Sequence, residues 1–254
     1  MTNPYTVDGA IGALVPTDAG DLQTALGSSW TEDFDSGPAI GGSLATSNTI
    51  WSVGNGSGGS LTGTPAAGLA GNPGVWTLDT GTSNNGRAGI LRGASLTQGY
   101  LYISNLFTVT IDWVFKIPII SSIGNTFDCA NGLGDTISTA GVGQNALIWR
   151  ALNTSIWACQ IISGGVVSPL SLTTAISVTN TWLRTRIACD KTSVKWSIGT
   201  GRTGALTQVH SVPLASLPAG LLASPIGQMA RIQKLTGALS RSVQLDLCEF
   251  ILSQ

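Results

Sequence analysis

Charged residues are scarce in this sequence. Lys, Arg, Asp and Glu make up 10% of the 254 residues, whereas about 25% is usual for a soluble domain. The 12 basic and 13 acidic residues nearly cancel, which leaves a net charge of -1. This balance argues against nucleic acid as a partner, because no basic field is present to hold a phosphate backbone. A surface with so little charge repulsion is typical of proteins that are partly covered by sister subunits.

Long apolar runs are also missing. No stretch reaches the roughly 18 uninterrupted apolar residues of a membrane helix, so we expect no membrane insertion. Residues 1–5 read Met-Thr-Asn-Pro-Tyr and lack the basic region and apolar run of a secretory signal peptide. We therefore expect a soluble protein. If it works outside a cell, it leaves by another route, such as release by lysis in an assembled virus.

Residue types that carry catalysis are few. His210 is the only histidine, and nothing in the sequence places a nucleophile beside it. Glu32 and Glu249 are the only glutamates, and they lie near opposite ends of the chain. Glycoside hydrolysis needs a pair of carboxylates at one site, which these positions do not predict. We predict no catalytic residues and no enzyme activity.

Signatures of cofactor and zinc sites are absent or out of context. Residues 54–59 match GxGxxG, but the sequence that follows, up to Pro65, cannot open the helix that a dinucleotide site needs. The cysteines form no CxxC pair, so zinc is not expected. Two disulfides remain open as an alternative, although buried free thiols are favoured because cysteine is often buried as a small apolar residue. The four cysteines are Cys129, Cys159, Cys189 and Cys248.

Two weaker ligand signals are present. A calcium site could combine Asp33 or Asp35 with Asp246 if the first and last strands pair, but a polar strand start is the favoured interpretation. Exposed tryptophans can stack on sugars, and Trp30, Trp51 and Trp76 are uncertain because they lie beside loop-rich sequence. Core positions are favoured for most of the eight tryptophans. We therefore predict no bound metal and no cofactor.

From Phe34 onward, strand patterns dominate the chain. Residues 107–117 alternate apolar and polar side chains over eleven positions, a period of two that excludes a helix. Residues 182–189 and 193–199 form a predicted hairpin around Asp190, and 243–250 form the last strand. The Gly-, Ser- and Pro-rich residues 54–74 are predicted to be a long surface loop. The spacing of strands and turns predicts an all-β, two-sheet antiparallel sandwich.

The predicted core follows from the alternating strands. Its members are Phe107, Val109, Ile111, Trp113, Phe115, Val194, Trp196, Ile198, Val243, Leu245 and Leu247.

The first 30 residues differ from the rest of the chain. Residues 18–27 carry the best helix signal, with Asp18 as a cap and Gly27 as a terminator. Several apolar residues in this segment have little local sequence to pack against. The segment is either an arm that docks on another subunit or a terminus folded on its own domain, and both interpretations remain open. The proposed docking residues are Val7, Ile11, Leu14, Leu22 and Leu26.

Three groups of segments resemble a known family. They are 72–81 followed by 86–91, 182–187 with its hairpin partner 194–196, and 229–234 followed by 241–246. In this order they are similar to the concanavalin A-like (laminin G-like) jelly rolls of bacteriophage virion proteins. The resemblance covers residues 31–254 and implies a jelly-roll sandwich there, preceded by a short N-terminal arm at 1–30.

The resemblance also implies a function. It points to a non-catalytic structural component of the virion surface that decorates the capsid or forms a short tail appendage. By analogy with such proteins we expect a homo-oligomer, a trimer, that contacts other virion proteins. The alternative is a carbohydrate-binding adhesin or receptor-binding module that recognises a host surface glycan. The resemblance assigns no ligand residues, because binding positions vary among these folds.

Overall fold

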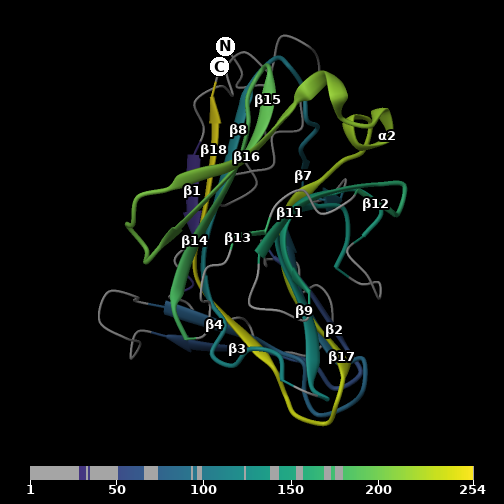
Figure 1. Ribbon diagram of the computed structural model, residues 1–254, viewed down its shortest axis with the longest axis vertical. Helices are drawn as coiled ribbons and strands as arrows, with labels where there is room; N and C mark the ends of the chain where they lie inside the picture. The colour runs from purple at the N-terminus through teal and green to yellow at the C-terminus, as the bar shows by residue number, and fades with distance from the viewer. Residues whose placement is uncertain are drawn as a thin grey trace, which may run out of the picture.

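Alternating apolar and polar side chains fold into two antiparallel sheets that pack face to face (Figure 1). The computed structural model describes residues 29–32, 34, 51–65, 74–92, 94–95, 99–122, 124–137, 143–152, 157–168, 173–174 and 180–253. The prediction of an all-β, two-sheet antiparallel jelly roll is confirmed. The docking residues Val7, Ile11, Leu14, Leu22 and Leu26 and the helix expected at 18–27 lie outside the described residues.

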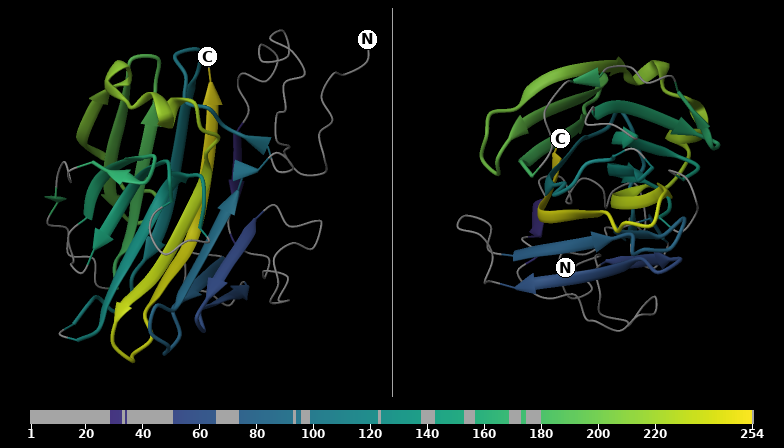
Figure 2. Two further views of the ribbon diagram at one scale, coloured as in Figure 1. Left: turned by 90° about the vertical axis from the view of Figure 1, so that its right-hand side faces the viewer. Right: turned by 60° about the horizontal axis from the view of Figure 1, so that its bottom comes forward.

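The first sheet, called the β8 sheet, has eight strands. Figure 2 (left) shows its green strands at one edge, its blue strands at the other and β18, in yellow, between them. In spatial order its strands are β16 (Thr207–Pro213), β15 (Ser193–Thr200), β14 (Trp182–Cys189), β8 (Thr108–Lys116), β18 (Ser242–Ser253), β4 (Gly74–Asp79) and β3 (Ser60–Pro65), with β1 (Ser29–Glu32) also pairing with β18.

The second sheet, called the β9 sheet, also has eight strands. In order these are β12 (Val166–Val167), β11 (Trp157–Ser163), β10 (Ala146–Leu152), β9 (Thr126–Gly134), β17 (Gly227–Thr236), β5 (Arg87–Arg92) and β2 (Ser52–Gly56), with β13 (Thr173–Thr174) pairing with β11. The short strands β6 (Ala94–Ser95) and β7 (Gly99–Tyr100) form a separate pair.

Helix is confined to short segments in the part of the chain that the structure describes. These are the 3-10 turn η1 (Leu214–Ser216) and the single turn α2 (Ala219–Leu222). Neither these nor any other described helix is long and apolar enough to cross a membrane.

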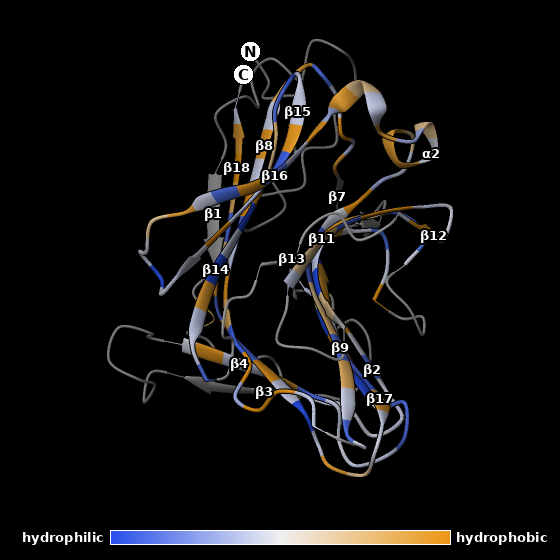
Figure 3. Ribbon diagram, viewed as in Figure 1, coloured by the Kyte–Doolittle hydropathy of each residue, from blue (hydrophilic) through white to orange (hydrophobic). Residues whose placement is uncertain are grey.

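The core lies between the sheets and follows the alternation of the strands. All eleven residues predicted for it are buried, and apolar and polar segments alternate along β14 in Figure 3. Trp51 and Trp76, uncertain from the sequence, are also buried. They pack on Phe34 with ring centroids 5.9 and 4.7 Å away. These contacts extend the core to the strands at the start of the chain.

Polar contacts between the sheets fix how they face each other. The Thr185 hydroxyl on β14 donates to the Asn131 side-chain oxygen on β9 at 2.8 Å, and both side chains are buried. The Trp149 indole N–H on β10 donates to the Arg186 carbonyl on β14 at 3.3 Å. Because a buried polar group is stabilised only with its partner in place, these bonds favour one alignment of the two layers.

The prediction of a loop over residues 54–74 is wrong for its first half, which forms β2 and β3. Glycine is needed in β2 for packing. A Cβ on Gly54 would come within 3.0 Å of the Ile137 side chain, and a Cβ on Gly56 within 2.7 Å of the Arg87 Nε. Ser57 and Gly58, both with positive φ, turn the chain from one sheet to the other. A glycine-rich composition therefore marks close packing here, and not a loop.

The favoured interpretation of the cysteines is confirmed. All four are free and buried. Burial raises the pKa of the Cys159 and Cys189 thiols to about 12. Thiols held in the protonated form are poor nucleophiles, so these residues act as core packing.

Candidate functional site

The outer face of the β8 sheet carries a compact ion-pair cluster, called the Asp112 cluster, made of Asp112, Arg184, Arg186 and Glu249. Strand register places Asp112 of β8 between Arg186 of β14 and Glu249 of β18. Asp112 accepts hydrogen bonds from the Arg184 Nε at 2.8 Å and from the Arg186 Nε and Nη2 at 2.6 and 2.7 Å. The Arg184 Nη2 also contacts Asp112 and lies 3.7 Å from Glu249.

This cluster is balanced in charge and open on its outer side. Two guanidinium groups meet two carboxylates, and the hydrogen bond to Asp112 is the main cause that raises the pKa of Arg186. Asp112 is only 1% exposed, whereas the side chains of Arg186 and Glu249 are 33% and 32% exposed. The buried carboxylate therefore positions the arginines, while the outer atoms remain available for contacts with a ligand.

Beside the cluster lies a cross-strand row of Trp182, Lys116 and Gln244, called the Trp182 row. Trp182 is half-buried, and the Lys116 Nζ lies 4.9 Å from the centroid of its ring. Burial lowers the pKa of Lys116. Every other tryptophan whose side chain is described is buried: Trp51, Trp76, Trp113, Trp149, Trp157 and Trp196. Trp182 is therefore the one described indole that keeps part of its surface in solvent.

The β18 end of the row contains an acceptor without a donor. The Gln244 Oε1 is buried and has no hydrogen-bond partner. Nearby on β18, Asp246 is buried and pairs with the Arg202 Nη1, at 3.1 and 3.3 Å. Arg202 follows β15, so this ion pair connects the loop after β15 to β18. We call the Trp182 row and the Asp112 cluster together the Trp182 face.

Comparison with known proteins identifies the fold. No protein-family model matches the sequence, and no curated protein matches it either. A protein of unknown function from Shewanella oneidensis MR-1 superposes with a TM-score of 0.60 at 18% identity, over 95% of each chain. The VIP36 exoplasmic/lumenal domain superposes in its Ca2+-bound form with a TM-score of 0.53 at 8% identity, over 88% of this chain and 89% of that one.

The Ca2+/Man-bound form of the VIP36 domain gives a TM-score of 0.54 at 8% identity, over 87% of this chain and 88% of that one. The chain therefore shares its two-sheet antiparallel, concanavalin A-like sandwich fold with these structures. Identities this low establish a shared fold, and the chemistry must be argued from the residues of this chain.

The two glutamates come closer than the sequence indicates. The first and last strands pair, so Glu32 of β1 and Glu249 of β18 lie on adjacent strands. They are out of register, because Glu32 pairs with Cys248 and Glu249 with Thr31.

The other residues considered for chemistry do not form a site. His210, on β16, packs against Trp196 with ring centroids 5.6 Å apart. Residues 54–59 run from β2 toward β3 and open no helix. Asp246 is ion-paired, while Asp33 and Asp35 lie outside the described residues. No group of three or more potential metal ligands occurs among the residues that the structure describes.

The Trp182 face was not predicted from the sequence, although part of the pattern that forms it is present there. Trp182, Arg184 and Arg186 alternate with apolar or core-facing neighbours along β14, and this pattern predicts a shared outer face. Their partners Asp112 and Gln244 come from distant strands, so only the register of β8 and β18 brings them into place.

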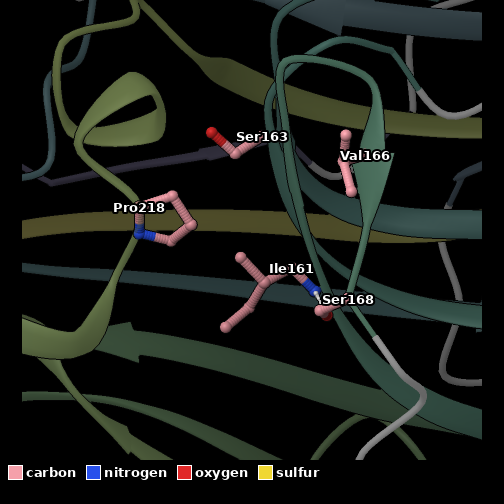
Figure 4. Close-up of a pocket in the computed structure, with 5 residues that line it drawn as sticks. All are labelled: Ile161, Ser163, Val166, Ser168 and Pro218. Atoms are coloured by element: carbon pink, nitrogen blue, oxygen red, sulfur yellow. Dashed lines mark hydrogen bonds between the residues drawn. The ribbon is translucent and has the colours of Figure 1, made fainter.

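A second candidate, a hollow of about 310 Å³, lies at the edge of the β9 sheet (Figure 4). Val166, on its rim, is 74% exposed, and the Ser168 hydroxyl already accepts the Ile161 N–H at 3.1 Å. With an apolar wall and two hydroxyl groups, this pocket offers few directional contacts, so it is the weaker candidate. Its lining residues are Ile161, Ser163, Val166, Ser168 and Pro218.

Proposed function

We propose that the chain is a non-catalytic carbohydrate-recognition domain that binds a sugar on the Trp182 face. The observation that carries this proposal is the partial exposure of Trp182 beside a preorganised set of charged and amide groups. An indole offers a rigid apolar surface for the C–H face of a sugar ring. A few well-placed polar groups around such a surface orient a ligand and give it specificity.

The flanking groups match the chemistry of sugar hydroxyls, which both donate and accept hydrogen bonds. Glu249 provides a partly exposed carboxylate as acceptor, and Arg184 provides guanidinium donors. Hydrogen bonds to such charged groups are stronger than those between neutral partners. The Gln244 amide adds a donor and an acceptor, and its Oε1 has no donor in the protein.

The similarity to the VIP36 domain supports this proposal at the level of fold, since that domain has been solved in Man-bound forms. The prediction of a capsid or tail component came first from the sequence. The lectin-like neighbours favour its alternative, the glycan-binding module, as the better-supported function.

The Asp112 cluster supports binding over cleavage. Asp112 and Glu249 are cross-strand neighbours, and glycoside hydrolysis requires a pair of carboxylates at one site. However, Arg184 and Arg186 each contact Asp112 through Nε and Nη2. With these donors in place, the carboxylate cannot reach a sugar to attack it or to protonate it.

A glycan array probed with the wild-type domain and with Trp182→Ala tests this function. We expect the wild type to bind a subset of glycans, and Trp182→Ala to lose about tenfold or more of the affinity for them. Tyr102→Ala is the matched control, since Tyr102 is another exposed aromatic residue and lies outside the Trp182 face. No glycan bound by the wild type, or equal binding by Trp182→Ala, would contradict the proposal.

A virion surface is our proposed setting for this activity. The observation that favours it is the low charge of the chain, together with its resemblance to phage jelly rolls. The arm at residues 1–30 would then dock a homotrimer on other virion proteins and present the Trp182 face to a host glycan. Electron microscopy of virions labelled with an antibody to this chain tests the location, and unlabelled particles would refute it.

A further inference from the structure

The Trp182 row contains a cation without a counter-ion. Lys116 is 8% exposed, and no acidic side chain of the described structure forms an ion pair with it. Its Nζ contacts the Trp182 ring, with 4.9 Å between the Nζ and the ring centroid. Lysine is almost never this buried unless its charge is paired. The residue therefore needs an explanation beyond packing.

The environment of Lys116 is unfavourable for its charge. Burial disfavours the charged form and lowers the pKa of this lysine. The contact with the Trp182 ring offsets part of this cost, but it gives the ammonium N–H groups no oxygen acceptor. A methionine would fill similar space without burying a charge. A ligand that brings both acceptor oxygens and negative charge would satisfy the group.

The carboxylates around the row do not supply this charge. The Asp112 cluster holds two guanidinium groups and two carboxylates, so it is balanced within itself. Nearby on β18, the buried Asp246 is paired with Arg202. Within the Trp182 face, Lys116 is thus the one charge left without a partner of opposite sign.

Strand register brings this charge next to the groups proposed to hold a sugar. Lys116 lies directly opposite Trp182 on one side and opposite Gln244 on the other. Residues paired in this way share one face of the sheet, and three neighbouring strands span roughly 10 Å. A single sugar residue can therefore contact neighbouring members of the row at once.

The ammonium is within reach of a ligand on the indole. The stem of Lys116 is covered, as lysine stems often are, but its Nζ keeps some contact with solvent. Because the Nζ lies against the half-buried Trp182 ring, a group that contacts the exposed part of the ring also comes near the ammonium. The Gln244 Oε1, which has no donor, can accept from a hydroxyl of the same sugar.

We propose that the Trp182 face selects an acidic sugar, whose carboxylate or sulfate group accepts hydrogen bonds from the Lys116 ammonium while the sugar ring packs on Trp182. This inference rests on the sugar binding proposed above and adds the class of sugar. Hydrogen bonds between charged partners are shorter and stronger than those between neutral ones. The bound anion also compensates the buried charge, so the acidic sugar binds more tightly than its neutral parent.

An array of matched acidic and neutral glycans tests the class of sugar. Its pairs include sialyllactose with lactose and sulfated with unsulfated N-acetyllactosamine, which separate a carboxylate from a sulfate. We expect the wild type to bind the acidic member of a pair about tenfold or more tightly than the neutral member. Lys116→Met and Lys116→Gln remove the charge with different packing, and both should bind the two members equally. Thermal melting checks that each variant is folded.

Lys191→Gln is the matched control, because it removes one positive charge from an exposed turn beyond the far end of β14. It should keep the preference for the acidic member. Equal affinities of the wild type for both members of every pair would overturn the inference. A preference that survives in the folded Lys116 variants, or one that Lys191→Gln loses to the same extent, would also overturn it.

Trp182→Ala separates this inference from the proposed function. Glycan binding that Trp182→Ala abolishes, but that shows no acidic preference, would leave the sugar site standing and refute only the class of sugar. Absence of glycan binding by the wild type, or binding that Trp182→Ala leaves unchanged, would refute the proposed function and this inference with it.

Discussion

Two buried tryptophans allow the value of an interior hydrogen bond to be measured in this fold. Trp149 and Trp196 are both fully buried. The Trp149 indole N–H donates to the Arg186 carbonyl at 3.3 Å, whereas the Trp196 indole N–H is buried without an acceptor. Replacing each by phenylalanine removes the same atoms from a similar environment. The difference between the two variants therefore reports mainly on the N–H group.

The magnitudes follow from these contacts. Trp149→Phe loses a hydrogen bond with a net value of about 1 kcal/mol, in addition to the cost of the lost volume. Trp196→Phe loses the same volume, but it also removes an unsatisfied buried donor. Removing that donor should increase the free energy of unfolding by about 1–3 kcal/mol. We therefore expect Trp149→Phe to be the less stable variant by about 2 kcal/mol or more. In a protein of this size, 2 kcal/mol corresponds to a difference in Tm of about 4–8 °C.

Urea denaturation followed by far-ultraviolet circular dichroism is the appropriate assay, because its signal does not depend on the number of tryptophans. Equal slopes of the unfolding free energy against urea would show that the two variants unfold from comparably compact states. If Trp196→Phe were as destabilised as Trp149→Phe, the Trp196 N–H would have to be satisfied in solution, and the reasoning would be refuted.

Three further predictions concern acid stability, thiols and metal removal. Lys195, followed by Thr192, holds the pKa of Asp190 well below its ordinary 3.8. The resulting stabilisation is complete above pH 3.8 and lost as the pH falls toward the folded-state pKa. Asp190→Asn should therefore lower the urea midpoint near neutral pH, with the difference vanishing in strong acid; a constant difference would contradict this. The four buried cysteines should react with a thiol reagent only after denaturation, and rapid labelling of the native protein would be inconsistent with their burial. Glycan binding should survive dialysis against EDTA, because the Trp182 face binds through side chains and Asp246 is engaged by Arg202; loss of binding that Ca2+ restores would show a cation site.

The strands that could be predicted from sequence are those with one wet face and one buried face. β8, β14 and β15 show this alternation, and their core residues follow directly from it. The rule fails at two positions in the middle of the β8 sheet. Val114 and Lys116 occupy polar-face positions of β8 but are buried.

The rest of the fold depends on contacts between distant residues, which composition and local sequence patterns do not predict. β2 and β3 were predicted as loop because glycine usually marks turns, whereas here it makes room for Ile137 and Arg87. The pairing of β1 with β18 joins the beginning of the described chain to its end, and no local pattern indicates it. The Asp112 cluster likewise joins residues 72 positions apart, so it depends on the register of whole strands.

The central claim is that a sugar binds against Trp182, and one measurement tests it directly. In a protein with 15N-labelled tryptophan, each indole N–H gives its own NMR signal, and the signal missing from Trp182→Phe identifies Trp182. Titration with a mannose oligosaccharide, or with the glycan selected on the array, should shift the Trp182 signal progressively to saturation. The signals of the buried indoles Trp113, Trp149, Trp157 and Trp196 should stay in place. Saturable binding that leaves the Trp182 signal unmoved would contradict the account.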